Sequence, residues 1–357
     1  MNIYKWMVLA ALALAVALPF TRQVVAGEFA DTLDTPALHS DLAAQGPLTG
    51  LASAGERLVV VGQRGHILYS DDAGRRWQQA EVPVSSDLVA VHFPSASQGW
   101  AVGHDGVVLH SADAGTTWTR QFDGRQVGPR MLAHYQAMAA AEPQNEAIAA
   151  LVAEAQRMTE EGADKPFLDV WFENERVGYV VGAFNLIFRT DDGGRSWTPW
   201  MERTENPGAL NLYGLRAVGD DLYIVGEQGL VLKLDAAGGR FKAVVTPYEG
   251  SYFGVIGKPG MALVYGLRGN LYRSLDRGAN WHKVELGLPV SIVAATLDPA
   301  GRVVLLSQAG HVLVSTDDGA SFAVQPQDAL APVSAALASG DSLVLAGTRG
   351  VRLLPLQ

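Results

Sequence analysis

The stretch VVGQRGHILYSDDAGRRW, residues 60–77, carries the pattern that decides the fold. An apolar pair and a glycine, Val60–Gly62, precede a second glycine and a short apolar run, which ends in the signature Ser/Thr-x-Asp-x-Gly-x-x-Trp from Ser70 to Trp77. In such a turn the aspartate can accept backbone N–H bonds, the glycine can adopt a positive φ, and the tryptophan can fill space between neighbouring sheets. The stretch therefore predicts short antiparallel strands joined by an Asp-box turn, with Asp72 and Trp77 in structural roles.

The same pattern recurs along the chain. Its structural aspartate and aromatic positions are Asp72 and Trp77, Asp113 and Trp118, Asp192 and Trp197, Asp276 and Trp281, and Asp317 and Phe322. A degenerate copy spans 226–241, and a last copy breaks off after 347–350. Successive copies begin 41, 79, 44, 40, 41 and 40 residues apart. About 40 residues with four apolar runs is typical of one propeller blade. The repeat predicts an all-β, seven-bladed β-propeller over residues 27–357.

The interval of 79 residues indicates an insertion between the second and third blades. Residues 124–163 contain neither the Gly-x-x-Gly turn of the repeat nor an Asp-box, and they are rich in alanine. The sequence therefore predicts a helical-hairpin insertion within the propeller, at 124–165. The last copy supplies only three apolar runs before the chain ends. Because an open ring leaves strand edges unpaired, we expect a strand at about 28–40 to close the last blade.

The first 26 residues have the features of a secretory signal peptide. Lys5 precedes an apolar run at 6–18, and small residues lie at positions 24 and 26. The run is short for a bilayer span. We expect cleavage after Ala26, a periplasmic protein, and no membrane span in the mature chain. The alternative is an uncleaved segment that anchors the protein in the inner membrane.

The composition and the absence of known catalytic motifs exclude several classes of function. The net charge of −10 makes nucleic acid an unfavourable partner, and the absence of cysteine excludes thiolate chemistry and disulfides. No hydrolase, zinc or phosphate-loop motif is present. We therefore expect no catalytic residues, no metal and no cofactor. Two alternatives stay open: a sialidase-like glycoside hydrolase, which needs an arginine cluster and an acid pair at the ring axis, and a periplasmic propeller that binds a small ligand in its axial channel.

The repeats resemble those of the photosystem II stability/assembly factor family of Asp-box (BNR-repeat) propellers, over roughly residues 48–357. The segment DKPFLDVWF at 164–172, after the helical insert, further resembles the proteobacterial branch of that family. The resemblance implies a non-enzymatic protein that acts through protein–protein interaction. It also implies a partner, since members of that branch are associated with exporters of the resistance-nodulation-division (RND) superfamily. The expected function is an assembly or accessory scaffold for a membrane protein complex, with an inner-membrane RND-type transporter as the favoured partner.

Two sets of residues are candidates for binding that partner. Turns between the second and third strands of the blades share a face with the insertion, and they carry Arg64, His104, Asp105, Phe184, Gln228, Arg268 and Arg349. The arginines suit an acidic partner. The insertion carries the apolar stripe of Met131, Tyr135, Leu151 and Met158 at helical spacing. This stripe either packs within a local core or forms a docking arm.

Overall fold

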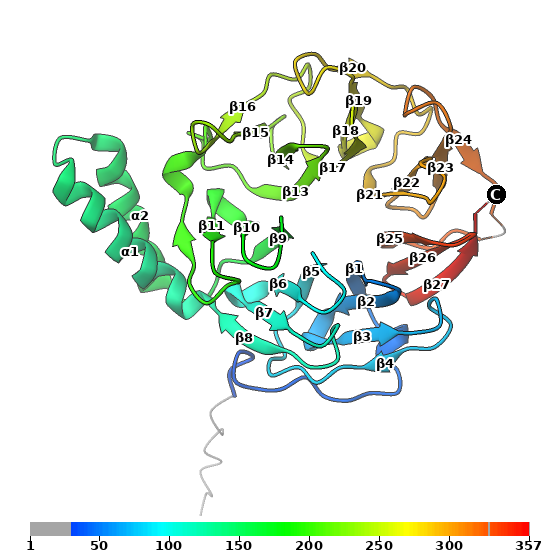
Figure 1. The fold of residues 1–357 in the computed structure, drawn as a ribbon, viewed down its shortest axis with the longest axis horizontal. Helices are drawn as coiled ribbons and strands as arrows, with labels where there is room; N and C mark the ends of the chain where they lie inside the picture. Colours follow the sequence, from blue (N-terminus) through cyan, green and yellow to red (C-terminus); the bar gives the residue numbers. More distant parts are fainter. Residues whose placement is uncertain (1–29, 328, 357) are drawn as a thin grey trace, which may run out of the picture. The chain divides into compact units, whose positions relative to one another are not determined.

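The computed structural model describes residues 30–327 and 329–356. Residues 32–357 form one compact unit, in which seven antiparallel sheets are arranged in a ring (Figure 1). The fold is the predicted seven-bladed propeller with a two-helix insertion. The predicted signal peptide at 1–26 lies outside the described residues. In the described part of the chain, no helix has the length and apolar character needed to cross a membrane.

The first three blades contain twelve strands. Blade 1 has β1 (Leu48–Ala54), β2 (Arg57–Gly62), β3 (Ile67–Ser70) and β4 (Gln78–Gln79). Blade 2 has β5 (Leu88–His92), β6 (Gly99–Gly103), β7 (Val108–Ser111) and β8 (Thr119–Phe122). Blade 3 has β9 (Phe167–Phe172), β10 (Gly178–Gly182), β11 (Ile187–Thr190) and β12 (Thr198–Pro199).

Four further blades complete the ring. Blade 4 has β13 (Leu212–Val218), β14 (Asp221–Gly226), β15 (Val231–Asp235) and β16 (Arg240–Ala243). Blade 5 has β17 (Tyr252–Lys258), β18 (Met261–Gly266), β19 (Leu271–Ser274) and β20 (His282–Lys283). Blade 6 has β21 (Ile292–Leu297), β22 (Val303–Ser307), β23 (Val312–Ser315) and β24 (Ala323–Gln325), and blade 7 has β25 (Val333–Ser339), β26 (Ser342–Gly347) and β27 (Gly350–Pro355).

The first strand of each blade lies nearest the ring axis, and strand order within each sheet follows the chain. Neighbouring first strands contact one another around the ring, and contacts between β25 and β1 complete it. The glycine that ends most second strands has a steric cause. A Cβ atom at Gly103 would lie 2.1 Å from the carbonyl oxygen of Asp87, and one at Gly266 would lie 2.1 Å from that of Ser251. The preceding first strand therefore leaves no room for a side chain there.

The Asp-boxes are closed hydrogen-bonded turns. In blade 1 the Ser70 hydroxyl donates to Asp72 at 2.9 Å and accepts the N–H of Gly74 at 2.9 Å, while Asp72 accepts the N–H of Arg76 at 2.8 Å. The Trp77 indole donates to the carbonyl of Gly74 at 2.9 Å. Equivalent serine or threonine bonds hold Asp113, Asp192, Asp276 and Asp317. These carboxylates are committed to turn geometry, as their structural role predicts.

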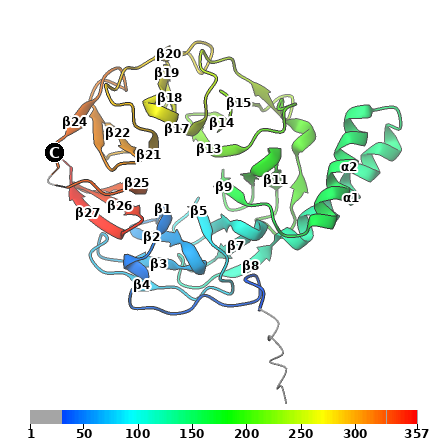
Figure 2. The same cartoon turned by 180° about the vertical axis from the view of Figure 1, so that it is seen from behind.

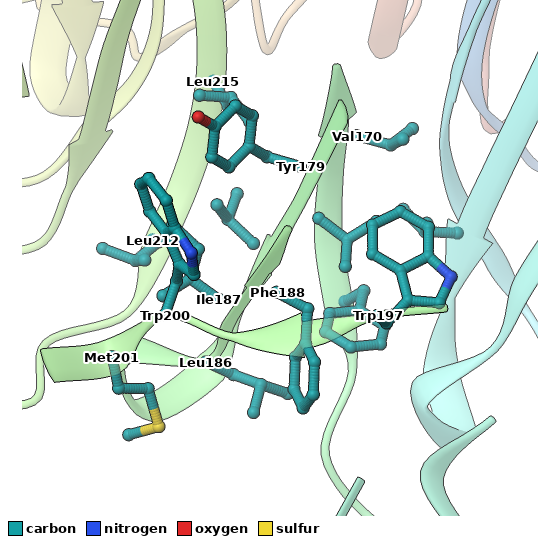
Figure 3. Close-up of a cluster of buried hydrophobic side chains, with 14 of the residues drawn as sticks. Val170, Tyr179, Leu186, Ile187, Phe188, Trp197, Trp200, Met201, Leu212 and Leu215 are labelled. Carbon is teal, nitrogen blue, oxygen red and sulfur yellow. The ribbon is translucent and has the colours of Figure 1, made fainter. Parts of the chain in front are cut away.

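The insertion consists of α1 (Gly124–Ala141) and α2 (Glu146–Glu161), which pack against each other beside blade 3 (Figures 1 and 2). Asp123 caps α1 by accepting the N–H of Arg125 at 3.0 Å, and Asn145 caps α2. The inner faces of both helices join the largest apolar core of the molecule, which is centred on blade 3 and includes Trp197, Trp200 and Met201 (Figure 3). The hairpin is thus an integral part of the propeller's packing.

The structure differs from the predicted closure of the last blade. The sheet of blade 7 has three strands, and residues 30–40 form no strand. Instead, Leu33 is buried in an apolar cluster of blades 1 and 2, and the N–H of Ala37 donates to the carbonyl of Val82 at 3.1 Å. A short 3₁₀ turn, η1 (Ala43–Gln45), lies beside β27. The segment therefore does not close blade 7, because its backbone N–H groups and its apolar side chains find their partners on blades 1 and 2.

Candidate functional site

One face of the ring carries the turns between second and third strands. Four of these are 3₁₀ turns: η2 (Gln63–Gly65), η3 (His104–Gly106), η4 (Ala183–Asn185) and η6 (Leu267–Gly269). Each places a non-glycine residue at positive φ, and blade 4 has an equivalent residue; they are Arg64, Asp105, Phe184, Arg268 and Gln228, with φ between 50° and 57°. The insertion begins on the same face, because a Cβ at Gly106 in η3 would lie 2.8 Å from the Cα of Gly124.

The predicted turn residues do not all remain available to a partner. Arg64, His104, Gln228, Arg268 and Arg349 are exposed. Among the described residues, the guanidinium groups of the three arginines have no carboxylate partner, and they lie on blades 1, 5 and 7. Asp105 is different, because its carboxylate accepts bonds from the hydroxyls of Thr32 at 2.8 Å and Ser86 at 2.6 Å. The Asp105 carboxylate therefore ties the N-terminal segment at Thr32 to the ring and is not free to bind a partner.

The apolar stripe of the insertion is mostly internal. Met131, Tyr135 and Met158 are buried in the core shared with blade 3. The Tyr135 hydroxyl donates to Glu202 at 3.1 Å and accepts the N–H of Met201 at 3.2 Å. These three residues cannot contact a partner, so the docking-arm hypothesis is wrong for them. Such stripes usually face a local core, and this one does.

Leu151, which is half-buried against the same core, and Phe184 both line a groove between the hairpin and the connector that joins blades 3 and 4. The groove has a volume of about 960 Å³. One wall comes from the end of α1 and from α2, and the other from η4 and residues 201–209. Its apolar lining is Met138, Ala147, Ile148, Ala150, Leu151, Phe184, Met201, Pro207 and Ala209. The groove unites one predicted insertion residue with one predicted turn residue.

Phe184 is the most prominent apolar side chain at this groove. It is 48% exposed, although its backbone has φ 54°, a conformation that L residues other than Asn and Asp rarely adopt. The N–H of Phe184 donates to the side chain of Asn211 at 2.7 Å, which holds the turn in place. The ammonium of Lys165 lies 5.6 Å from the centre of its ring. A strained turn, held through its backbone, thus presents a half-exposed aromatic ring in the lining of the groove.

The charged lining of the groove is predominantly acidic. It contains Glu142, Glu154, Glu202 and Glu205 against one cation, Arg157, which is paired with Glu154 and Glu161. Burial raises the pKa of Glu202, but the neighbouring His134 and hydrogen bonds from its own backbone and from Tyr135 outweigh burial and leave the pKa below its usual range. Glu202 is therefore ionised at neutral pH. The lining of the groove is therefore both apolar and acidic.

Sequence reasoning missed the wall formed by residues 201–209. Met201 belongs to a 3₁₀ turn, η5 (Met201–Arg203), whose residues continue into an ordered connector. The Asn206 amide donates to Asn185 and to the carbonyl of Leu210, both at 2.9 Å. The signal was present in the repeat, since the third and fourth copies begin 44 residues apart instead of 40 or 41. The extra residues are those of this connector.

A second cavity, of about 430 Å³, lies on the ring axis and is lined by all seven first strands. Its charged lining, within the described ranges, is one arginine and one aspartate, Arg216 and Asp169, which pair with each other. A sialidase-like site needs several arginines and an acid pair, so this lining does not favour that alternative. Nowhere in 30–327 or 329–356 do three or more His, Asp or Glu side chains gather as a metal site would require.

The model of the photosynthesis system II assembly factor YCF48 family matches residues 51–144 and 148–323. The chain belongs to this family. The match spans most of the ring, and the break between its two segments, at 145–147, falls in the helical hairpin where α2 begins. A search of curated protein sequences finds no match.

Solved structures share the fold. A structure of YCF48 bound to D1 peptide is 16% identical, with a TM-score of 0.64 over 90% of this chain and 99% of that chain. YCF48 from Cyanidioschyzon merolae is 13% identical, with a TM-score of 0.64 over 90% and 98%. The GH74 enzyme of Niastella koreensis is also 13% identical, with a TM-score of 0.61 over 87% of this chain and 52% of that one. At these identities the structural likeness concerns the propeller alone, while the YCF48 family match rests on sequence.

Proposed function

We propose that this YCF48-family propeller is an exported, non-enzymatic scaffold that binds a segment of a membrane protein and assists the assembly or operation of its complex. The observation that carries the proposal is the groove, an exposed site of protein-binding dimensions on a propeller whose family is named for assembly of a membrane complex. A YCF48 structure with bound D1 peptide supports peptide binding as a mode of action in this family.

The favoured partner is an inner-membrane exporter of the RND superfamily, on the strength of the resemblance of residues 164–172 to the proteobacterial branch. The predicted export signal at 1–26 would bring the propeller to the periplasmic side of that membrane. The insertion and the turns with Arg64, Arg268 and Arg349 would then face the exporter together, since they occupy one face of the ring.

A catalytic role receives less support. The axial cavity, where propeller hydrolases would need converging arginines and acids, holds one ion pair between Asp169 and Arg216. The Asp-box carboxylates are occupied by turn hydrogen bonds. The likeness to a GH74 enzyme, at 13% identity, concerns the fold alone.

The test is affinity purification from gently solubilised native membranes, with a tag at the C-terminus of the full chain, followed by mass spectrometry. We expect stoichiometric recovery of an inner-membrane RND-type transporter. The paired variant Phe184→Asp with Leu151→Glu should lose it, whereas Glu160→Gln, on an exposed part of α2 outside the groove, should keep it. Recovery of the propeller alone, under conditions that preserve other membrane complexes, would overturn the proposal.

A further inference from the structure

The groove is selective in its chemistry. Its apolar lining consists of methionine, alanine, isoleucine, leucine and proline side chains and the half-exposed ring of Phe184. Four glutamates and one arginine make up its charged lining. The arginine is already occupied, because Arg157 binds Glu154 at 2.5 Å and Glu161 at 2.6 Å. Arg203 and Arg240, which lie outside the lining, are 3.2 Å from Glu202 and 3.9 Å from Glu205. Glu142 has no cationic partner among the described residues, so the lining itself keeps an excess of negative charge.

The acids lie on both walls. Glu142 follows α1 and Glu154 lies on α2, while Glu202 and Glu205 belong to the connector between blades 3 and 4. Glu142 accepts the amide of Asn145 at 2.8 Å, whereas Glu205 accepts the N–H of Ala243 at 3.0 Å and lies 3.9 Å from the guanidinium of Arg240. Carboxylates on two opposed walls can be approached from within the groove by cations on both sides of one inserted segment.

We infer that the groove binds an amphipathic helical segment whose apolar stripe enters the groove and whose flanking lysines and arginines meet the glutamates of its two walls. This inference rests on the proposed function and names the chemistry of the segment bound. Apolar helix faces lie in grooves of this kind through anchors at i, i+3, i+4 and i+7. Phe184 and Leu151 would contact that stripe. Methionines at 138 and 201 suit it, because flexible thioether chains adapt to varied apolar shapes.

Charge complementarity distinguishes this occupant from others. An acidic segment would bring like charges onto Glu142 and Glu205, and an anionic lipid surface would be repelled in the same way. The free arginines of the same face lie on blades 1, 5 and 7, away from the groove between the hairpin and blades 3 and 4. The face therefore has two electrostatically different regions, and the basic helix belongs to the acidic one.

The test uses the full chain and two labelled 18-residue peptides in fluorescence anisotropy. The first peptide is helical, with leucines on one face and lysines on the other, and the second replaces every lysine by glutamate. We expect the lysine peptide to bind at least about tenfold more tightly, with affinity that falls as salt rises. Equal affinity of the two peptides would overturn the inference.

Variants locate the binding. Phe184→Ala should weaken the lysine peptide by about tenfold, since exposed aromatic anchors dominate such contacts. Glu142→Gln with Glu205→Gln should weaken it about three- to tenfold and reduce its salt dependence, because glutamine keeps the hydrogen-bond acceptors but removes the charge. Glu160→Gln is the matched control, as it removes a charge from α2 outside the groove. Equal loss in the control, or none in the groove variants at unchanged melting temperature, would contradict the site.

Other occupants give different results. If residues 1–26 fill the groove, the lysine peptide should bind only after their removal. If a second copy fills it, sedimentation should show a dimer that Phe184→Ala dissociates. Either result would overturn the inference. Peptide binding without recovery of a membrane partner would keep the inference and remove the proposed function, while recovery of a partner that survives the groove variants would do the reverse.

Discussion

Asp169 and Arg216 join blades 3 and 4 beside the ring axis. Arg216 Nη1 lies 2.5 Å from Asp169 Oδ2, and the same carboxylate accepts the N–H groups of Leu215 at 2.7 Å and Val170 at 2.9 Å. The Asp169 side chain is 6% exposed, whereas that of Arg216 is 41% exposed toward the axial cavity. The ion pair and the Leu215 bond therefore tie β9 to β13 at the ring's inner edge.

Replacement of Arg216 by methionine should lower the free energy of unfolding by about 2–4 kcal/mol, because it leaves the Asp169 carboxylate buried without its countercharge. The double variant Arg216→Met with Asp169→Asn should lose less free energy of unfolding than the sum of the two single variants, since it leaves no charge buried without a partner. Urea unfolding measures all three. Arg75→Met, at an exposed position, is the control and should change stability by less than about 0.5 kcal/mol. Strict additivity of the two changes would show that the pair is not coupled.

Leu33 should anchor the N-terminal segment. Its side chain is 1% exposed and belongs to the apolar cluster that includes Val82 and Val84, so Leu33→Ala should destabilise the protein by about 2–4 kcal/mol through lost burial and a residual cavity. Leu38, 79% exposed on the same segment, is a matched control whose replacement by alanine should have little effect. Thermal melts compare the two. Similar melting temperatures for both variants would contradict the packing of this segment on blades 1 and 2.

The same segment shows what the sequence could not reveal. The blades were predictable because each depends on local chemistry: a glycine where the preceding strand leaves no room, and an aspartate that closes its own turn. The position of residues 30–40 depends instead on distant partners. Leu33 packs in an apolar cluster of blades 1 and 2, and Asp34 pairs with Arg120 and Arg125, which are 86 and 91 residues away in the sequence. The three apolar runs of the last repeat copy predicted a blade that lacks its fourth strand. The local sequence of residues 30–40, however, did not indicate where in the ring this segment would pack.

The groove was half predictable for a similar reason. Helical spacing predicted the hairpin, and the turn pattern placed Phe184 on the same face. Amphipathicity alone does not say whether an apolar stripe packs in a core or faces a partner. Here Met131, Tyr135 and Met158 are buried in the core. The groove is formed by what remains exposed of α2 and by a connector whose sequence has no periodic pattern. The groove therefore forms only because of the way in which the hairpin packs against blade 3.

Tyr135 should hold the hairpin to the connector. Its buried hydroxyl bonds both Glu202 and the backbone of Met201, so Tyr135→Phe should cost about 1–2 kcal/mol and speed amide hydrogen exchange in α1 and at Met201. Tyr69→Phe is the control, because the Tyr69 hydroxyl bonds only the exposed side chain of Gln78. An unchanged exchange rate in α1 would show that the hydroxyl does not secure the hairpin. Replacing 129–163 by a Gly-Ser linker should likewise destabilise the ring, since it removes part of the core of blade 3.

His92 should make stability depend on mild acid. Burial, and then the charge of Arg216, lower the pKa of His92 to about 3, and its Nδ1 accepts the N–H of Phe172 at 3.1 Å, which requires the neutral ring. The unfolded chain binds a proton at this residue below about pH 6.5, whereas the folded chain does so only near pH 3. Stability is therefore lost as pH falls through that window, by at most about 1.4 kcal/mol per pH unit from this group.

The measurement is urea unfolding between pH 7.5 and pH 5, above the range in which the Asp-box carboxylates titrate. His92→Asn should be less stable at pH 7.5, because the ring's packing is lost, but its stability should fall less steeply toward pH 5 than that of the wild type. Burial also lowers the pKa of His66 and of His110, so a smaller slope should persist in the variant. His282→Asn, at an exposed position, should keep the wild-type slope. If His92→Asn keeps it as well, the neutral histidine beside Arg216 is not what makes the propeller sensitive to acid.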